Sequence, residues 1–276
     1  MCPPRHFEVV YEINPWMHRE VKVSSDAAAE QWEELRRTLQ SAGATVELLP
    51  AEPGAPDLVF TANAGLVSGS TFVPAHFHHR ERQVETPYDV AWFRAAGFQI
   101  RELPAAVDHE GAGDALPFAG SLLSGYRFRS DLRAAAELSA VLGCPVRSVE
   151  LVDHRLYHLD LTFCPLDDHR AICAPCGWDR YGQRVIAALV PEPLELTEDE
   201  ALTFCANSVV VGTTVVMPAC PPRVGRRLES WGFDVVVCAV DEFLKAGGGC
   251  RCLTLALDVT LGPASAPHDG GGEDHG

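Results

Sequence analysis

The stretch SDLRAAAELSAVLGCPVRSVEL, residues 130–151, contains a complete helix–stop–strand unit. Its apolar spacing up to Leu142 predicts a helix, and Gly143 is the type of residue that ends one. The residues after Gly143 predict a strand. One such unit is too small to bury its apolar face alone, so the question is whether the chain repeats it.

Four other segments have the same shape. A helix over 25–42 ends at Gly43 and precedes the strand-like ATVELLP, 44–50, and similar units follow at 88–104, 183–197 and 224–240. Their stops recur every roughly 40 to 55 residues, a period that indicates a repeat architecture. The sequence therefore predicts an α/β fold built from five repeated units.

A polar or glycine-bearing turn that runs into an apolar strand also recurs five times. These turns are PDLVFTANAGLV (56–67), DHEGAGDALPF (108–118), LYHLDLTFCPL (156–166), ALTFCANSVVVG (201–212) and AGGGCRCLTLAL (246–257). If the units stand around an axis, the turns converge on one pocket. That pocket would contain Asn63, Glu110, His158, Asp160, Asn207 and Cys252.

The composition is that of an ordinary globular protein with a strongly acidic balance. The chain has 276 residues, is 47% hydrophobic and 22% charged, and carries a formal net charge of −16. This charge argues against nucleic acid or an anionic membrane as a partner and is compatible with a small cationic substrate. We expect a cytoplasmic protein, because no signal peptide or membrane-length apolar run is seen and the ten cysteines are scattered as buried, reduced thiols would be.

Several motifs together resemble the guanidine-modifying superfamily of arginine deiminases, dimethylarginine dimethylaminohydrolases and amidinotransferases, and most of all its arginine dihydrolase branch. The motifs are INPWM (13–17), PDLVFTANAGLV, RERQ (80–83), EGAGDAL (110–116), FRS (128–130), YHLD (157–160) with FCPL (163–166), and CLTL (252–255). The resemblance implies a five-bladed, pseudo-fivefold α/β propeller of ββαβ modules around a central active site. We expect one catalytic domain over 1–262 and a disordered polar tail over 263–276.

The resemblance also implies a role for eight residues. Cys252 matches the family's nucleophile, His158 its general acid/base, and Glu110 the carboxylate that grips the guanidinium. Asp160 matches the aspartate of the deiminase H-L-D motif, and Asn63 matches the dihydrolase asparagine where deiminases generally carry aspartate. The three residues that match those holding the α-amino and α-carboxylate groups are Asn14, Arg82 and Arg129.

These residue types suit the chemistry of a guanidinium. Two carboxylates can bind the edges of this planar cation and turn one face of its central carbon toward a nucleophile. A cysteine thiolate, helped by an imidazolium or by the bound cation, attacks that carbon, and a histidine moves the protons. The mechanism requires neither a metal nor an organic cofactor, and the sequence contains no phosphate loop or dinucleotide fingerprint.

Several alternatives remain open at this stage. The leading hypothesis is conversion of L-arginine to ornithine, ammonia and carbon dioxide. A deiminase or dimethylarginine hydrolase that stops at citrulline, an amidinotransferase, or a regulatory protein that only binds arginine are the others. A zinc or redox site at Cys173 and Cys176, or zinc at His76, His78 and His79, is disfavoured. Cys250 stands where relatives have a small residue, and the sequence leaves a homo-oligomer open.

Overall fold

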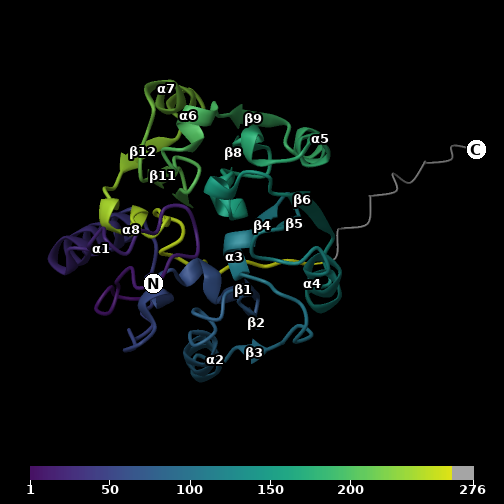
Figure 1. The fold of residues 1–276 in the computed structure, drawn as a ribbon. Helices are drawn as coiled ribbons and strands as arrows, with labels where there is room; N and C mark the ends of the chain where they lie inside the picture. Colours follow the sequence, from purple (N-terminus) through teal and green to yellow (C-terminus); the bar gives the residue numbers. More distant parts are fainter. Residues whose placement is uncertain (263–276) are drawn as a thin grey trace, which may run out of the picture.

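Four three-stranded sheets, each with one accompanying helix, stand around a common centre (Figure 1) in the computed structural model, which describes residues 1–262. In each sheet the first two strands pair antiparallel, and the third strand, which follows the helix, pairs parallel with the second. This is the predicted ββαβ module, formed four times. The predicted disorder of 263–276 lies outside the described residues.

The modules follow one another along the chain. The first contains β1 (Gly65–Ser68), β2 (Thr71–Pro74), α2 (Thr86–Ala95) and β3 (Gln99–Ile100). The second contains β4 (Ala115–Phe118), β5 (Ser121–Tyr126), α4 (Ala134–Leu142) and β6 (Val146–Glu150). The third contains β7 (Phe163–Pro165), β8 (Arg170–Cys173), α5 (Arg180–Leu189) and β9 (Glu192–Glu195). The fourth contains β10 (Val209–Val211), β11 (Thr214–Met217), α7 (Pro222–Ser230) and β12 (Asp234–Val237).

The helix stops read from the sequence are confirmed. α4 ends at Leu142, and Gly143 follows with a φ of 66°, in the left-handed region where a side chain is costly. Gly43, Gly97 and Gly232 follow their helices with φ values of 108°, 90° and 86°. α5 instead ends just before Pro191, as the sequence predicted.

A helix without a sheet occupies the fifth place in the ring. There α1 (Ser25–Ser41) lies beside α8 (Asp241–Leu244), as Figure 1 shows. The predicted strand at 44–50 is wrong: this segment is irregular, although the Leu49 N–H donates to the Met1 carbonyl at 3.0 Å. A strand needs a continuous partner. Within residues 1–262 no hairpin forms beside this segment, because the apolar run after Cys252 is also turn and coil.

Residues from both ends of the described chain close the ring at this fifth place. The Phe7 and Phe243 rings stack with centroids 5.0 Å apart. The Asn14 side chain donates to the Ala246 carbonyl at 3.0 Å, and the Ser24 N–H donates to the Glu242 carboxylate at 2.7 Å. Each of the other four places is one continuous segment.

Short helical turns lead into the modules and crowd the centre. They are η1 (Pro56–Val59) and η2 (Thr61–Ala64) before β1, α3 (Gly111–Asp114) before β4, and η3 (His154–Leu156) and η4 (Leu159–Leu161) before β7, with η5 (Pro175–Gly177) and α6 (Glu198–Ala201) later in the chain. Cys205 lies in the turn after α6, because β10 begins only at Val209. None of the helices in 1–262 combines the length and apolar composition of a membrane span.

Candidate active site

Cys252 lies in the turn after the glycine run, and the Asn207 side chain holds it there. The Asn207 amide nitrogen is 3.2 Å from the Cys252 Sγ. The Asn207 Oδ1 accepts the backbone N–H groups of Arg251 and Cys252 at 3.1 and 3.2 Å. One amide therefore fixes both the backbone and the sulfur of the expected nucleophile.

A buried carboxyl group also contacts this sulfur. The Cys252 thiol donates to Asp160 Oδ2 at 3.4 Å, and both residues are almost fully buried. Burial, and then the neighbouring Asp160, raise the pKa of the Cys252 thiol well above its ordinary value. Burial raises the pKa of Asp160 to about 7, although Arg251 and hydrogen bonds with Cys252 and Asn207 oppose the rise. In this arrangement the thiol is neutral, and a cation bound beside it would favour the thiolate.

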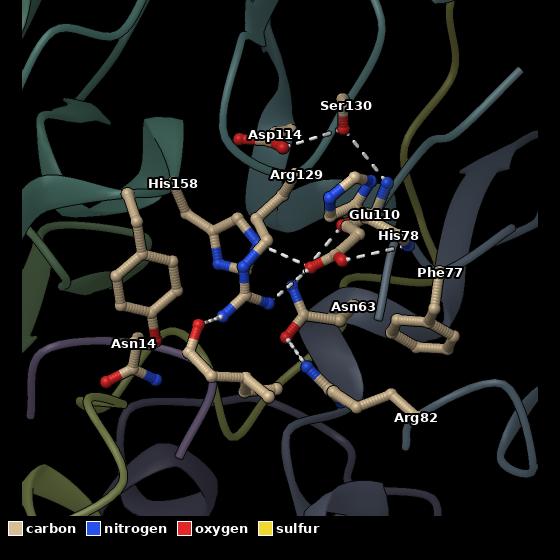
Figure 2. A network of polar contacts seen from close by, with 12 residues as sticks. Asn14, Asn63, Phe77, His78, Arg82, Glu110, Asp114, Arg129, Ser130 and His158 are labelled. Atoms are coloured by element: carbon tan, nitrogen blue, oxygen red, sulfur yellow. Dashed lines mark hydrogen bonds and ion pairs between the residues drawn. The ribbon is translucent and has the colours of Figure 1, made fainter. Parts of the chain in front are cut away.

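Glu110 and His158 form a buried pair on the other side of the site. Glu110 Oε2 is 2.8 Å from His158 Nε2 and accepts from Arg129 Nη1 at 2.9 Å (Figure 2). Burial alone would raise the pKa of Glu110, but Arg129 and the bond to His158 hold it well below its usual range. Glu110 is therefore an anion that already grips one guanidinium, that of Arg129.

A chain of hydrogen bonds anchors this pair to the fold. The Glu110 N–H donates to Ser130 Oγ at 3.0 Å, and the Ser130 hydroxyl donates to Asp114 at 2.6 Å (Figure 2). Asp114 also accepts the Leu159 N–H at 3.1 Å. Burial raises the pKa of Asp114 to about 6, against the attraction of His158. The turns that carry Glu110 and His158 are thus fixed to each other.

Asn63 connects Glu110 to a second buried arginine. Its side-chain nitrogen donates to the Glu110 carbonyl at 3.3 Å, and its oxygen accepts from Arg82 Nη1 at 2.8 Å. Arg82 donates its Nε and Nη2 to Glu85 at 2.8 and 2.7 Å, a bidentate pair. Figure 2 shows Asn63 between the Arg82 and Glu110 side chains.

The glycine run lets the nucleophile's loop approach the opposite wall. A Cβ on Gly248 would lie 2.3 Å from the Phe60 ring, so a larger residue would displace the loop or the ring. The Tyr157 hydroxyl donates to the Gly247 carbonyl at 2.9 Å, and Arg129 stacks on the Tyr157 ring at 4.6 Å. The glycine run therefore allows the loop that carries Cys252 to pack closely against Phe60 and Tyr157, which are side chains of the protein itself.

Five of the eight predicted residues line one cavity: Asn14, Asn63, Arg82, Arg129 and Cys252. The other three contact this group: Glu110 bonds to Arg129, Asp160 to Cys252, and His158 to Glu110. The cavity measures about 10 Å³, the room taken by one water molecule. The site is therefore closed around Arg129, and a substrate needs the arginine to move.

The other candidate centres fall outside this network. No cluster of three histidine, cysteine or acidic residues in 1–262 is arranged to hold a metal ion. His76 and His78 are bonded to Asp108 at 3.0 and 2.7 Å at the surface. None of the ten cysteines, all within this range, forms a disulfide, and the Cys250 thiol points toward the carbonyl of buried Cys238 at 3.9 Å.

Some residues of the site had no role assigned from the sequence. Asn207 was expected near the pocket but not as the group that holds Cys252. Tyr157, Asp114 and Ser130 lie inside the motifs YHLD, EGAGD and FRS, yet their contacts depend on which turns meet in space. The positions could be found from the motifs, whereas the pairings required the structure.

Comparisons with known proteins show to which family the chain belongs. A family model described as "N,N dimethylarginine dimethylhydrolase, eukaryotic" matches residues 11–259. The bifunctional arginine dihydrolase/ornithine cyclodeaminase ArgZ of Synechocystis is 41% identical over 268 residues, which cover 95% of this chain and 38% of ArgZ. The N(G),N(G)-dimethylarginine dimethylaminohydrolase of Mycobacterium tuberculosis is 38% identical over 259 residues, 93% of this chain and 84% of that enzyme.

Solved structures of the ArgZ N-terminal domain have the same fold. A cysteine-to-serine mutant bound to substrate matches with a TM-score of 0.91 at 41% identity, covering 95% of this chain and 98% of that one. An asparagine-to-serine mutant covalently bound to a reaction intermediate matches with a TM-score of 0.92 over the same shares. This chain thus spans under two fifths of the full bifunctional relative. On the family match and these identities, the chain belongs to the dimethylarginine dimethylaminohydrolase family of guanidino-group hydrolases.

Proposed function

We propose that this chain hydrolyses the guanidinium group of L-arginine to ornithine, two molecules of ammonia and carbon dioxide through a covalent intermediate on Cys252. One observation carries the proposal. A guanidinium, that of Arg129, already lies against the ionised Glu110 in the cavity that Cys252 lines. Two relatives, 41% and 44% identical to this chain, are named as bifunctional arginine dihydrolases, which supports the choice of arginine.

Binding begins with an exchange of cations. The substrate guanidinium replaces Arg129 at Glu110, so the buried carboxylate keeps a cationic partner throughout. Arg129, released, is then free to pair with the substrate's α-carboxylate, while Asn14 and Arg82 lie in the same cavity to hold the amino acid end. Asp160 takes the second edge of the guanidinium, where the positive charge favours the ionised form of its carboxyl group.

Chemistry then proceeds through a thioether. The bound cation favours the Cys252 thiolate, which attacks the guanidinium carbon to give a tetrahedral adduct. His158 protonates a terminal nitrogen, the C–N bond breaks, and ammonia leaves an amidino-thioether. His158 next removes a proton from water, the hydroxide adds to the same carbon, and the C–S bond breaks. This yields citrulline and restores the thiol.

A second cycle at the same carbon converts citrulline to ornithine. The thiolate attacks the ureido carbon, His158 protonates the remaining terminal nitrogen, and ammonia leaves a thiocarbamate on Cys252. Water then adds to the same carbon and the C–S bond breaks, and the carbamic acid so formed loses carbon dioxide to give ornithine. The two cycles together consume two waters per arginine. Asn63 is the residue we assign to this second cycle, because a neutral amide there tolerates a neutral ureido group where a carboxylate would favour a cation.

A second candidate is hydrolysis of N-methylated arginine to citrulline and a methylamine. The 38% identical M. tuberculosis enzyme, named for that activity, favours it. Transfer of the amidino group to an amine would use the same thioether with an amine in place of water.

The test incubates the protein with L-arginine, and separately with N,N-dimethylarginine, and quantifies ornithine, citrulline, ammonia and dimethylamine. We expect ornithine with two ammonia per arginine, and loss of at least about 10⁴-fold in kcat for Cys252→Ser. Citrulline as the final product would move the function to a deiminase. Dimethylamine release in place of arginine turnover would establish the second candidate.

A further inference from the structure

The segment that carries Cys252 separates the active-site cavity from a second, larger one. Asn63 and Cys252 line the first cavity, whereas Thr61 and Arg251 line the second. The two segments of this partition are joined where the Ala62 N–H donates to the Cys252 carbonyl at 3.1 Å. The second cavity measures about 690 Å³, within the range of small-molecule sites.

Polar groups without partners lie at this partition. The Thr61 hydroxyl is buried, with the residue 5% exposed, and has no hydrogen-bond partner. The buried Arg251 Nε has none either, and the Arg251 guanidinium forms no ion pair with any residue in 1–262. A buried donor without a partner costs about 1–3 kcal/mol, so a native structure normally satisfies such groups. Two of them on one cavity wall indicate a ligand with acceptor oxygens.

The remaining walls are largely apolar. They come from α1, the segment 43–49, α2, β10 and the coil after Cys252, and include Leu39, Trp92, Phe93, Val210, Leu255 and Leu257. Two further acidic residues, Glu47 and Asp258, also line this cavity. Apolar walls favour a ligand with an apolar body. The Arg251 guanidinium, which has no ion-pair partner among residues 1–262, and the Thr61 hydroxyl in the same cavity favour a ligand whose polar end is a carboxylate.

A buried carboxyl group in the same cavity fits this ligand as well. Both oxygens of Asp89 lack partners, and the residue is 1% exposed. Burial and the nearby Glu85 raise the pKa of Asp89 well above its ordinary value, so it is a neutral donor that adds no repulsion.

We propose that the second cavity binds a small organic acid with an apolar body, its carboxylate held by Arg251 and Thr61. The site lies directly behind the nucleophile and is independent of which guanidine the active site processes. The backbone N–H groups of Arg251 and Cys252 both donate to the Asn207 side-chain oxygen. A ligand bound to Arg251 would therefore contact the residue next to the nucleophile in the chain.

The experiment titrates the whole chain with 4-phenylbutyrate and with its neutral amide in a calorimeter. We expect one site per chain and binding of the acid at least about tenfold tighter than that of the amide, the worth of one charge-assisted pair. No binding of the acid, or equal binding of both compounds, would overturn the proposal.

Variants locate the binding site. Arg251→Gln, which removes the charge and keeps a polar side chain, and Thr61→Val, which keeps the side-chain shape, should each weaken acid binding by about tenfold. Val210→Trp, which narrows the cavity, should also weaken it. Circular dichroism checks that each variant is folded. Folded variants that bind the acid as tightly as the wild type would refute the assignment. Displacement of the acid by L-arginine would also refute it, because the acid would then bind in the active site.

Discussion

Asn63 is positioned so that a change of one atom alters its contacts on both sides. In the wild type its nitrogen donates to the Glu110 carbonyl and its oxygen accepts from Arg82. Asn63→Asp keeps the shape, replaces the donor by an acceptor, and adds a negative charge beside Arg82. We expect the variant to bind arginine and release mainly citrulline, because the added charge disfavours a neutral ureido group in the second cycle.

The measurement for this variant is the ratio of citrulline to ornithine at complete consumption of arginine. Thermal unfolding of both proteins serves as the control for structural damage. An Asn63→Asp protein that still releases only ornithine would remove Asn63 from the second cycle.

Asp160 couples function to stability. Its pKa rises from 3.8 to about 7 in the folded protein, so between these pH values the unfolded chain releases the proton first. The Asp160 contribution therefore reduces stability as pH increases through this window, by at most about 4 kcal/mol. Asp160→Asn should be more stable than wild type at pH 8, by an amount that shrinks toward pH 4, while arginine turnover falls on the order of 10²-fold.

Urea denaturation at a series of pH values measures the Asp160 effect. A stability difference that is independent of pH would show that Asp160 is already ionised in the folded protein.

The residue types of the site could be predicted from the sequence, but one important pairing could not. The sequence predicts Cys252, His158, Glu110 and Asp160 in one pocket, and the structure joins them in two contacting pairs, Cys252 with Asp160 and His158 with Glu110. The ion pair between Arg129 and Glu110 was not expected. It joins two side chains of one module across the centre, and the spacing of residues along the chain does not show which way either side chain points.

At the scale of elements, Gly143 tests the repeat that decides the fold. Its φ of 66° costs any residue with a Cβ about 1–2 kcal/mol. Gly143→Ala should lower the free energy of unfolding by about 1 kcal/mol and leave arginine turnover unchanged, since nothing lies within 4 Å of the added Cβ. Gly143→Asn should cost less, because asparagine tolerates this region. An alanine variant as stable as wild type would contradict the strain argument.

The strands could be predicted from the sequence where the strand that pairs with each of them belongs to the same module. β6 and the other third strands pair with a strand of their own module, so local apolar patterns and glycine stops sufficed. The segment 44–50 has an equally strand-like composition, yet it lies where no hairpin forms. Strand formation there depends on a neighbour that the segment itself does not encode.

At the scale of the molecule, the Phe7–Phe243 stack holds the ring closed. Phe243→Ala should lower the free energy of unfolding by about 3–5 kcal/mol and reduce arginine turnover, because α8 precedes the glycine run that positions Cys252. Phe118→Ala, in the core shared by the second and third modules, is the matched control. It should lose comparable stability and keep its turnover at temperatures where both proteins are folded. Equal turnover in the two variants would contradict the link between closure and catalysis.

The closed ring also divides the catalytic groups between two halves of the chain. Glu110, Asn63 and Arg82 precede the exposed Val152, whereas His158, Asp160 and Cys252 follow it. Two separate polypeptides, 1–152 and 153–276, would each lack part of the machinery and be inert alone. Mixed together, they would regain activity only by reassembling the ring, so this hydrolase could report by complementation whether two proteins fused to its halves have met.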